Sequence, residues 1–196
     1  MNFTNFKADY VHALFSSLFL KLLLHYKKIH YSSITSVGFP LIQLKGRGKL
    51  SFGNNIVLIN TFKASTLGKN TRCKILVYDN AFLSIGNKVG MSNVTIVATK
   101  SISIGSNVMI GAGTTIIDSD FHSLNSIDWF TDQDEKKMCS KSVVIGDNVF
   151  IGMNTIILKG TTIGANSIIA AGSVVSCSIP SSEVWGGNPA RFIKKN

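Results

Sequence analysis

The sequence predicts an all-β fold, a parallel β-helix, from a six-residue apolar repeat and from the small residues that accompany it. A large aliphatic residue recurs at every sixth position of the C-terminal half: Ile145, Ile151, Ile157, Ile163, Ile169 and Val175. A small or β-branched residue stands two positions before each of them: Val143, Val149, Thr155, Thr161, Ser167 and Ser173. The same spacing of six separates Ile104, Ile110 and Ile116. A hexapeptide repeat of this kind is the sequence signature of a parallel β-helix.

A period of six fits neither an α-helix nor a plain strand as a single element. It fits a chain that alternates short strands and corners, with one residue in six pointing into the prism and the small residue two earlier on the same strand face. Gly146 with Asn148, and Gly164 with Asn166, occupy the expected corners, where positive φ is easily adopted. Stacked coils then pair their backbones and bury a column of Ile and Val.

The composition fits one compact domain with an anionic partner. The chain has 196 residues, is 45% apolar and only 15% charged, and has a positive mean hydropathy, which favours a folded protein over disorder. A net charge of +10 indicates nucleic acid, anionic lipid or a phosphorylated small molecule as partner. Because the repeat region has no basic run with interleaved aromatic residues, nucleic acid is not expected.

The cysteines indicate a reducing compartment. Cys73, Cys139 and Cys177 lie far apart, without a CxxC motif and without an even count. This pattern argues against a disulfide framework and fits the cytoplasm. We expect each to be a small hydrophobe rather than a nucleophile.

Residues 1–35 differ from the repeat region and predict an N-terminal helical segment. The stretch from Tyr10 to Tyr26 has no Gly or Pro, and Lys21 interrupts its apolar run. That run is too short to span a bilayer, and it lacks the cleavage site of a signal peptide. Two interpretations stay open. The helix covers the end of the β-helix or a neighbouring subunit, or it makes a peripheral membrane contact at the inner face, with its basic residues on anionic lipid.

Residues 36–180 are expected to form the parallel β-helix, and its first coils are irregular. Leu50, Ile56 and Phe62 stand six apart in a looser version of the repeat. Terminal repeats are often degenerate in this way. We therefore expect the coils to begin before the repeat becomes regular.

The repeat is interrupted once, over residues 118–142, and it ends before a tail of residues 181–196. Because the period resumes cleanly at Ile145, the interruption must leave the prism as an extruded loop and return. Long loops inside a compact repeat are usually functional. The tail is expected to close the column.

His122, in this loop, is the one histidine of the repeat region, and Asp118 and Asp120 flank it. A histidine is the natural proton acceptor near neutral pH, and a carboxylate can fix its tautomer. The alternative is a solvent-exposed loop histidine without a role. Spacing within a loop does not decide which aspartate, if either, orients the ring.

At this point the chain resembles a known family. The run IGSNVMIGAGTTI, the loop with its histidine, the run VVIGDNVFIGMNTIILKGTTIGANSIIAAGSVV and the closing GGNPARFIKK are similar to the hexapeptide-repeat acyltransferases. Maltose and galactoside O-acetyltransferases, serine acetyltransferase and the O-acetyltransferases of capsule and O-antigen synthesis look most alike. The resemblance is strong over 85–195, weak over 40–84 and absent over 1–39.

The resemblance implies a left-handed β-helix, an exception to the usual crossover rule, and a homotrimer with active sites between subunits. The acyl donor would be acetyl-CoA, lying along the groove between two prisms. His122 matches the catalytic histidine of the family. As general base it would take a proton from a substrate hydroxyl, which attacks the thioester while backbone N–H groups stabilise the oxyanion.

The resemblance also places the cofactor. Met153, Ala171 and Ser176 match positions that contact coenzyme A, largely through backbone atoms, although Met153 replaces a residue that is often small. Arg191 and Lys194 match cationic positions at the nucleotide end, which suits a polyanion, and the alternative is a solvated basic tail. Trp185 replaces a usually small residue, where it either covers the pantetheine or acetyl end or packs at the base of the prism.

We expect an O-acetyltransferase that acts on a saccharide hydroxyl, in surface polysaccharide biosynthesis. An N-acetyltransferase on an amino sugar nucleotide would use the same histidine with an amine acceptor. A hexapeptide-repeat carbonic anhydrase needs three histidines around zinc, so no metal is expected, and a non-catalytic scaffold is the remaining alternative. One group of loop residues either shapes the acceptor pocket or forms a solvated tip: Trp129, Phe130, Asp132, Asp134 and Glu135.

Overall fold

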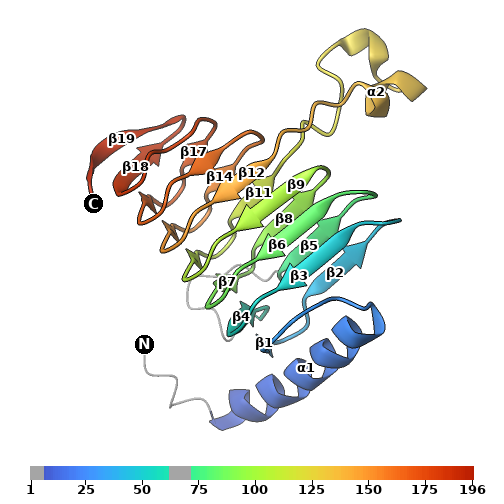
Figure 1. The fold of residues 1–196 in the computed structure, drawn as a ribbon, viewed down its shortest axis with the longest axis vertical. Coiled ribbons are helices and arrows are strands. Elements are labelled where there is room, and N and C mark those ends of the chain that lie inside the picture. The colour runs from blue at the N-terminus through green and yellow to red at the C-terminus, as the bar shows by residue number, and fades with distance from the viewer. Residues whose placement is uncertain (1–6, 62–71) are drawn as a thin grey trace.

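The computed structural model describes residues 7–61 and 72–196, with side chains from residue 12 onward. It shows a parallel β-helix whose strands form three faces (Figure 1). Phe62 of the looser repeat, and residues 1–6 of the predicted helical segment, lie outside the described residues.

Each face of the prism is one sheet, named here by its first strand. The β1 sheet contains β1 (Ile34–Val37), β4 (Ile56–Ile59), β7 (Gly90–Ser92), β10 (Met109–Ile110), β13 (Phe150–Ile151), β16 (Ile168–Ile169), β18 (Glu183–Gly187) and β19 (Ala190–Lys195). The β2 sheet contains β2 (Leu41–Leu44), β5 (Lys74–Val77), β8 (Thr95–Ala98), β11 (Thr115–Ile117), β14 (Ile156–Ile157) and β17 (Val174–Val175). The β3 sheet contains β3 (Lys49–Phe52), β6 (Phe82–Ile85), β9 (Ser101–Ile104), β12 (Val143–Ile145) and β15 (Thr162–Ile163).

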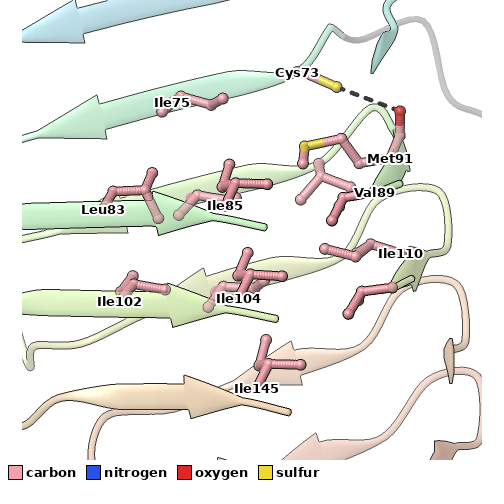
Figure 2. Packing of buried hydrophobic residues seen from close by; sticks show 14 of the residues in the cluster. Cys73, Ile75, Leu83, Ile85, Val89, Met91, Ile102, Ile104, Ile110 and Ile145 are labelled. Atoms are coloured by element: carbon pink, nitrogen blue, oxygen red, sulfur yellow. Dashed lines mark hydrogen bonds between the residues drawn. The ribbon is translucent and has the colours of Figure 1, made fainter. Parts of the chain in front are cut away.

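The repeat residues stack in register from coil to coil, as predicted. Ile145 pairs with Ile163, 18 residues later, and Ile151 pairs with Ile169. Figure 2 shows the column at Ile85, Ile104 and Ile145. The repeat isoleucines are fully or almost fully buried, as are the small residues two positions before each. Burial of such a side chain contributes about 1.5–3 kcal/mol, so the column is the main stabilising feature of the prism.

The corners use asparagine and glycine for different reasons. Asn148 and Asn166 adopt φ of 58° and 61°, as predicted, and the amide of Asn148 donates to Asn166 at 3.0 Å. For Gly146 and Gly164 the expectation of positive φ is wrong. They are glycine because the next coil lies too close, and a Cβ at Gly164 would lie 2.4 Å from the backbone nitrogen of Ser181.

Helix α1 (Lys7–Tyr26) packs on the N-terminal end of the column, against β1 (Figure 1). Leu20 and Leu24 are buried there, and the Ser16 hydroxyl donates to the Ser36 carbonyl at 2.6 Å. This confirms the packing interpretation of the N-terminal segment with respect to the β-helix end. No helix in the described ranges is long and apolar enough to cross a membrane.

The extruded loop leaves the prism after β11 and returns at β12. Ile104 pairs with Ile145 across an interval of 41 residues, whereas the coil that follows the loop uses 18, from Ile145 to Ile163. The loop contains a short 3-10 helix, η2 (Ser126–Asp128), and helix α2 (Asp132–Lys136), which projects from the column in Figure 1. At the opposite end of the column from α1, β18 and β19 form an antiparallel hairpin.

Candidate active site

Hydrogen bonds within the extruded loop hold its histidine segment in place. The Ser123 backbone N–H donates to Asp134 at 2.7 Å, and the Ser123 hydroxyl donates to Asp128 at 2.7 Å. The Ser123 carbonyl accepts a hydrogen bond from the Trp129 indole at 2.7 Å. Because Ser123 follows His122 directly, these three bonds fix the backbone that carries the histidine.

Asp128 is the buried anchor of this loop. Its carboxylate is 5% exposed, and Lys137 donates to it at 2.6 Å. The hydrogen bonds from Lys137 and Ser123 hold the pKa of Asp128 below its ordinary value. The carboxylate therefore stays ionised and joins the two ends of the segment from Ser123 to Lys137.

The aspartate that orients His122 is Asp134, on α2. The Nδ1 atom of His122 lies 2.7 Å from Oδ2 of Asp134, while the other carboxylate oxygen accepts from Ser123. The hydrogen bond with His122, followed by that from Ser123, lowers the pKa of Asp134. An ionised Asp134 accepts the Nδ1 proton, and this tautomer leaves the Nε2 lone pair available as a base.

The two aspartates that flank His122 in sequence serve other partners. Both oxygens of the buried Asp118 carboxylate accept backbone N–H groups, from Thr99 at 2.7 Å and Lys100 at 2.8 Å. Asp120 forms an ion pair with Lys159 on the neighbouring coil, which raises the pKa of Lys159. Both therefore fix the root of the loop to the prism rather than orienting the histidine.

A cavity of about 310 Å³ lies beside His122. Asp134, Glu135 and Met138 line it from the loop, and Tyr78 and Thr99 line it from two coils of the prism. The sequence offered no signal for Tyr78 or Thr99, because only the stacking of coils brings them beside the loop. His122 is 71% exposed, so its base is accessible to a substrate.

The remaining candidate acceptor residues divide between two settings. Glu135 lines the cavity with Asp134, whereas Phe130 is fully exposed at the loop tip. Trp129 is half-exposed and is held by its bond to Ser123. Asp132 lies at the start of α2 and lines an adjoining depression with Glu135 and Lys136.

Met153 and Ala171 lie at one corner of the prism, between the β1 and β2 sheets, in successive coils. The Gly172 N–H donates to the Met153 carbonyl at 2.8 Å and stacks the two turns. The backbone N–H groups of Met153 and Ala171 donate to no acceptor among residues 7–61 and 72–196. Two stacked turns with free donors suit contact with a carbonyl oxygen of a ligand.

A different corner shows how such donors are otherwise satisfied. Between the β3 and β1 sheets, the Asn87 N–H donates to the Ser106 hydroxyl at 3.0 Å, and the Ser106 N–H donates to the Asp147 carboxylate at 2.6 Å. The side chain of the next coil therefore caps the N–H below it. At the Met153 corner the next coil presents Ala171, whose methyl group accepts no hydrogen bond.

Within one chain, His122 and the Met153 corner are not brought together. His122 emerges at the corner between the β2 and β3 sheets, which is also where the exposed Ser176 lies after β17. Met153 and Ala171 lie at another edge of the prism. A site that uses both sets of residues therefore needs a second subunit.

The C-terminal hairpin presents two of the predicted cations. Arg191 and Lys194 on β19 are exposed, and neither forms an ion pair with any residue that the structure describes. By contrast, Lys195 binds Glu183 at 2.6 Å and lowers its pKa. Arg191 and Lys194 are thus free to bind an anion.

Trp185 on β18 packs at the end of the column. Its ring meets Phe192 edge to face at 6.4 Å, and its indole N–H donates to Glu183 at 2.8 Å. It is half-buried against the core. These contacts favour the packing alternative for Trp185.

The described residues include no group of three or more His, Cys, Asp or Glu side chains that could hold a metal ion. Proton transfer by His122 is the chemistry that the site residues themselves supply. The fold and the site together define a parallel β-helix protein with a candidate general base in its extruded loop.

Comparison with known proteins agrees with this class. Residues 142–177 match the family described as bacterial transferase hexapeptide (six repeats), and residues 92–117 match the hexapeptide repeat of succinyl-transferase. The chain is 32% identical over 166 residues to the galactoside O-acetyltransferase of Lactococcus lactis subsp. lactis (strain IL1403), covering 82% of this chain and 71% of the relative. It is 28% identical over 172 residues to WbbJ of Escherichia coli (strain K12), which is named for O-acetyl transfer in lipopolysaccharide biosynthesis, covering 86% and 82%.

Solved structures show the same fold. The hexapeptide-repeat acetyltransferase VCA0836 of Vibrio cholerae O1 biovar eltor, complexed with acetyl-coenzyme A, is 35% identical with a TM-score of 0.52, over 58% of this chain and 60% of that chain. A mutant of AntD, an N-acyltransferase from Bacillus cereus in complex with dTDP and coenzyme A, has a TM-score of 0.69 at 18% identity, over 89% and 88%.

The chain belongs to the hexapeptide-repeat acetyltransferase family. Its fold is accordingly the left-handed parallel β-helix. The protein is accordingly an acyltransferase, and the similar structures of VCA0836 and of a galactoside acetyltransferase hold acetyl-coenzyme A and coenzyme A.

Proposed function

We propose that this protein transfers the acetyl group of acetyl-CoA to a hydroxyl of a saccharide, in the biosynthesis of a surface polysaccharide. The observation that carries the proposal is the pair of His122 and Asp134 beside an open cavity. The relatives named for galactoside O-acetylation and for lipopolysaccharide O-acetylation support a saccharide acceptor.

In this reaction Nε2 of His122 takes the proton of the acceptor hydroxyl as its oxygen attacks the thioester carbon. The carbonyl oxygen becomes an oxyanion, which the free N–H groups of Met153 and Ala171 stabilise. Collapse of this intermediate breaks the carbon–sulfur bond. The thiolate of coenzyme A then takes the proton from His122, and the products are an acetyl ester and free coenzyme A.

The active protein is a homotrimer in this proposal, since His122 and the Met153 corner belong to different edges of the prism. Cyclic symmetry places an edge of one prism beside a different edge of its neighbour. Coenzyme A then lies in the groove between subunits, with Arg191 and Lys194 at its phosphates and the exposed Ser176 along its path. Trp185 contributes by packing the hairpin that holds the two cations.

The acceptor binds in the cavity beside His122. Tyr78 offers an aromatic ring, and Thr99 and Glu135 offer hydrogen-bonding groups. Aromatic faces and carboxylates suit the hydroxyl-rich surface of a sugar. Because acetyl-CoA is a cytoplasmic metabolite, the reaction takes place on the cytoplasmic side.

The test is release of free thiol from acetyl-CoA by the purified protein with a panel of neutral sugars, amino sugars and oligosaccharides. We expect transfer to hydroxyl groups, giving products that mild alkali hydrolyses, and a loss of about 100- to 10,000-fold in His122→Ala. Lys88→Ala, an exposed change outside the site, serves as the control. Transfer only to amino groups would contradict O-acetylation, and unchanged transfer by His122→Ala would contradict the assigned base.

A further inference from the structure

Helix α1 has two apolar faces, and the β-helix covers only one of them. The inward face is buried on the column by Leu20 and Leu24, together with Ser16 and Ser17. The opposite face, called the outward face below, is apolar and 49–83% exposed; its residues are Leu14, Phe15, Leu18, Phe19, Leu22 and Tyr26. A helix that is apolar all round is normally buried all round, so the outward face lacks its partner in the isolated chain.

Phe15 and Phe19, at one edge of the outward face, meet the Phe39 ring edge to face at 6.2 and 5.3 Å, and the rest of the face points away from the column. At 100° per residue, Leu18 and Leu22 lie on the side of the helix opposite Leu20 and Leu24. Figure 1 shows α1 lying across the N-terminal end of the column, with the C-terminal hairpin at the other end. A partner of this face therefore lies across the N-terminal end of the column and contacts α1 along the length of the helix.

The surroundings of this face are basic. The sequence has no acidic residue between Asp9 and Asp79, whereas ten of the 20 Lys and Arg residues fall in this interval. Lys21 on the helix is exposed, and Lys27 and Lys28 follow its last turn. None of these three lysines forms an ion pair with a described residue. An apolar strip beside uncompensated positive charge complements the surface of an anionic bilayer.

We propose that the outward face of α1 is a docking surface for an anionic lipid bilayer, with the helix lying in the plane of the interface. The apolar side chains enter the boundary between headgroups and acyl chains, and Lys21, Lys27 and Lys28 bind lipid phosphates. Since α1 cannot cross a membrane, the contact is peripheral.

The trimer of the proposed function would present this face to a flat partner such as a bilayer. In the trimer proposed above, the three columns run side by side, so that three outward faces lie in one plane; this step rests on the proposed function.

The experiment is sedimentation of the purified full-length protein with vesicles of phosphatidylcholine alone, or of phosphatidylcholine and phosphatidylglycerol in equal parts. We expect wild-type protein to bind the anionic vesicles more strongly. The double variant Leu18→Ser/Leu22→Ser should lose about tenfold or more in binding, because it removes two apolar side chains from the interface. The variant Lys27→Glu/Lys28→Glu should lose the preference for phosphatidylglycerol.

The matched control is Leu124→Ser/Ile127→Ser, which removes two exposed apolar side chains from the extruded loop. It should bind anionic vesicles as wild type does, and thiol release by each variant shows that the site is intact. Binding of wild type to neither vesicle, or equal loss in the loop control, would overturn the proposal. Sedimentation velocity gives a further test. If the wild-type protein sedimented with twice the mass of the Leu18→Ser/Leu22→Ser variant, a second copy would cover the outward face, and this would also overturn the proposal. Vesicle binding does not depend on acetyl transfer, so its failure is separate from failure of the proposed reaction.

Discussion

The substitution Asp134→Asn tests whether the loop orients His122 for catalysis. In the wild-type loop one carboxylate oxygen accepts the Ser123 N–H and the other lies 2.7 Å from Nδ1 of His122. Asparagine has one oxygen and one NH2 group in nearly the same shape. If its oxygen keeps the Ser123 bond, the NH2 group faces Nδ1 and favours the tautomer that protonates Nε2. If the amide is reversed, two donors meet at Ser123.

The size of the effect follows from the exposure of the pair. A wrong tautomer removes the base that takes the hydroxyl proton, which is worth about 100- to 10,000-fold in rate. His122 is 71% exposed, so water competes with Asp134 and the ring can return to the active tautomer. We therefore expect a loss of about 10- to 100-fold in kcat for Asp134→Asn, smaller than for His122→Ala.

The assay is steady-state thiol release with the best acceptor from the saccharide screen. The KM for acetyl-CoA should change little, because Asp134 is bound to His122 and Ser123 and is not among the residues proposed to contact coenzyme A. Asp134→Glu, which keeps the charge, should recover part of kcat, and Lys136→Gln on the same short helix should match wild type. An unchanged kcat in Asp134→Asn, or a loss confined to KM, would refute the orienting role.

Two further predictions concern the loop and the core. The lowered pKa of Asp128 means that its stabilising contribution is present above its ordinary value of 3.8 and is lost as the pH falls through the lower folded value. The measurement is the fluorescence of Trp129 in a Trp185→Phe background, where it is the one remaining tryptophan. This fluorescence should stay constant from neutral pH down to about 4 and change only below it, whereas in Asp128→Asn it should be altered already at neutral pH. Equal acid transitions in both proteins would contradict the role of Asp128 as the anchor of the loop. Ile157 is 0% exposed, so Ile157→Ala should lower the free energy of unfolding by about 2–5 kcal/mol in urea denaturation. The 81% exposed Ile127 provides the control Ile127→Ala, which should stay within about 0.5 kcal/mol of wild type, and equal losses would contradict the assigned core.

Much of the fold could be predicted from local pattern. A period of six has one simple solution, in which each sixth side chain points inward, and Ile145, Ile163 and their equivalents do so. The break in the period located the extruded loop, because residues that leave the prism cannot keep its spacing. The roles of Gly146 and Gly164 were not predictable in this way. Glycine is required at these positions because the backbone of the next coil lies too close for a Cβ atom, and not because of their own φ.

The candidate site was predictable only as a set of residue types. His122 could be found because it was the one histidine of the repeat region, but its partner Asp134 stands 12 residues away in an irregular loop. The nearer carboxylates, Asp118 and Asp120, are bound to backbone N–H groups and to Lys159. Sequence distance within a loop carries no information about which carboxylate reaches the ring.

By itself, the sequence determined the β-helix, the position of the loop and the candidate base, because each is a matter of local period or residue type, and the resemblance to a family added the cations of the tail. The tertiary structure decided which aspartate meets His122, which N–H groups are left without acceptors at the Met153 corner, and which face of α1 is left uncovered. These depend on contacts between segments far apart in the chain, and only the stacking of coils and the folding of the loop establish them.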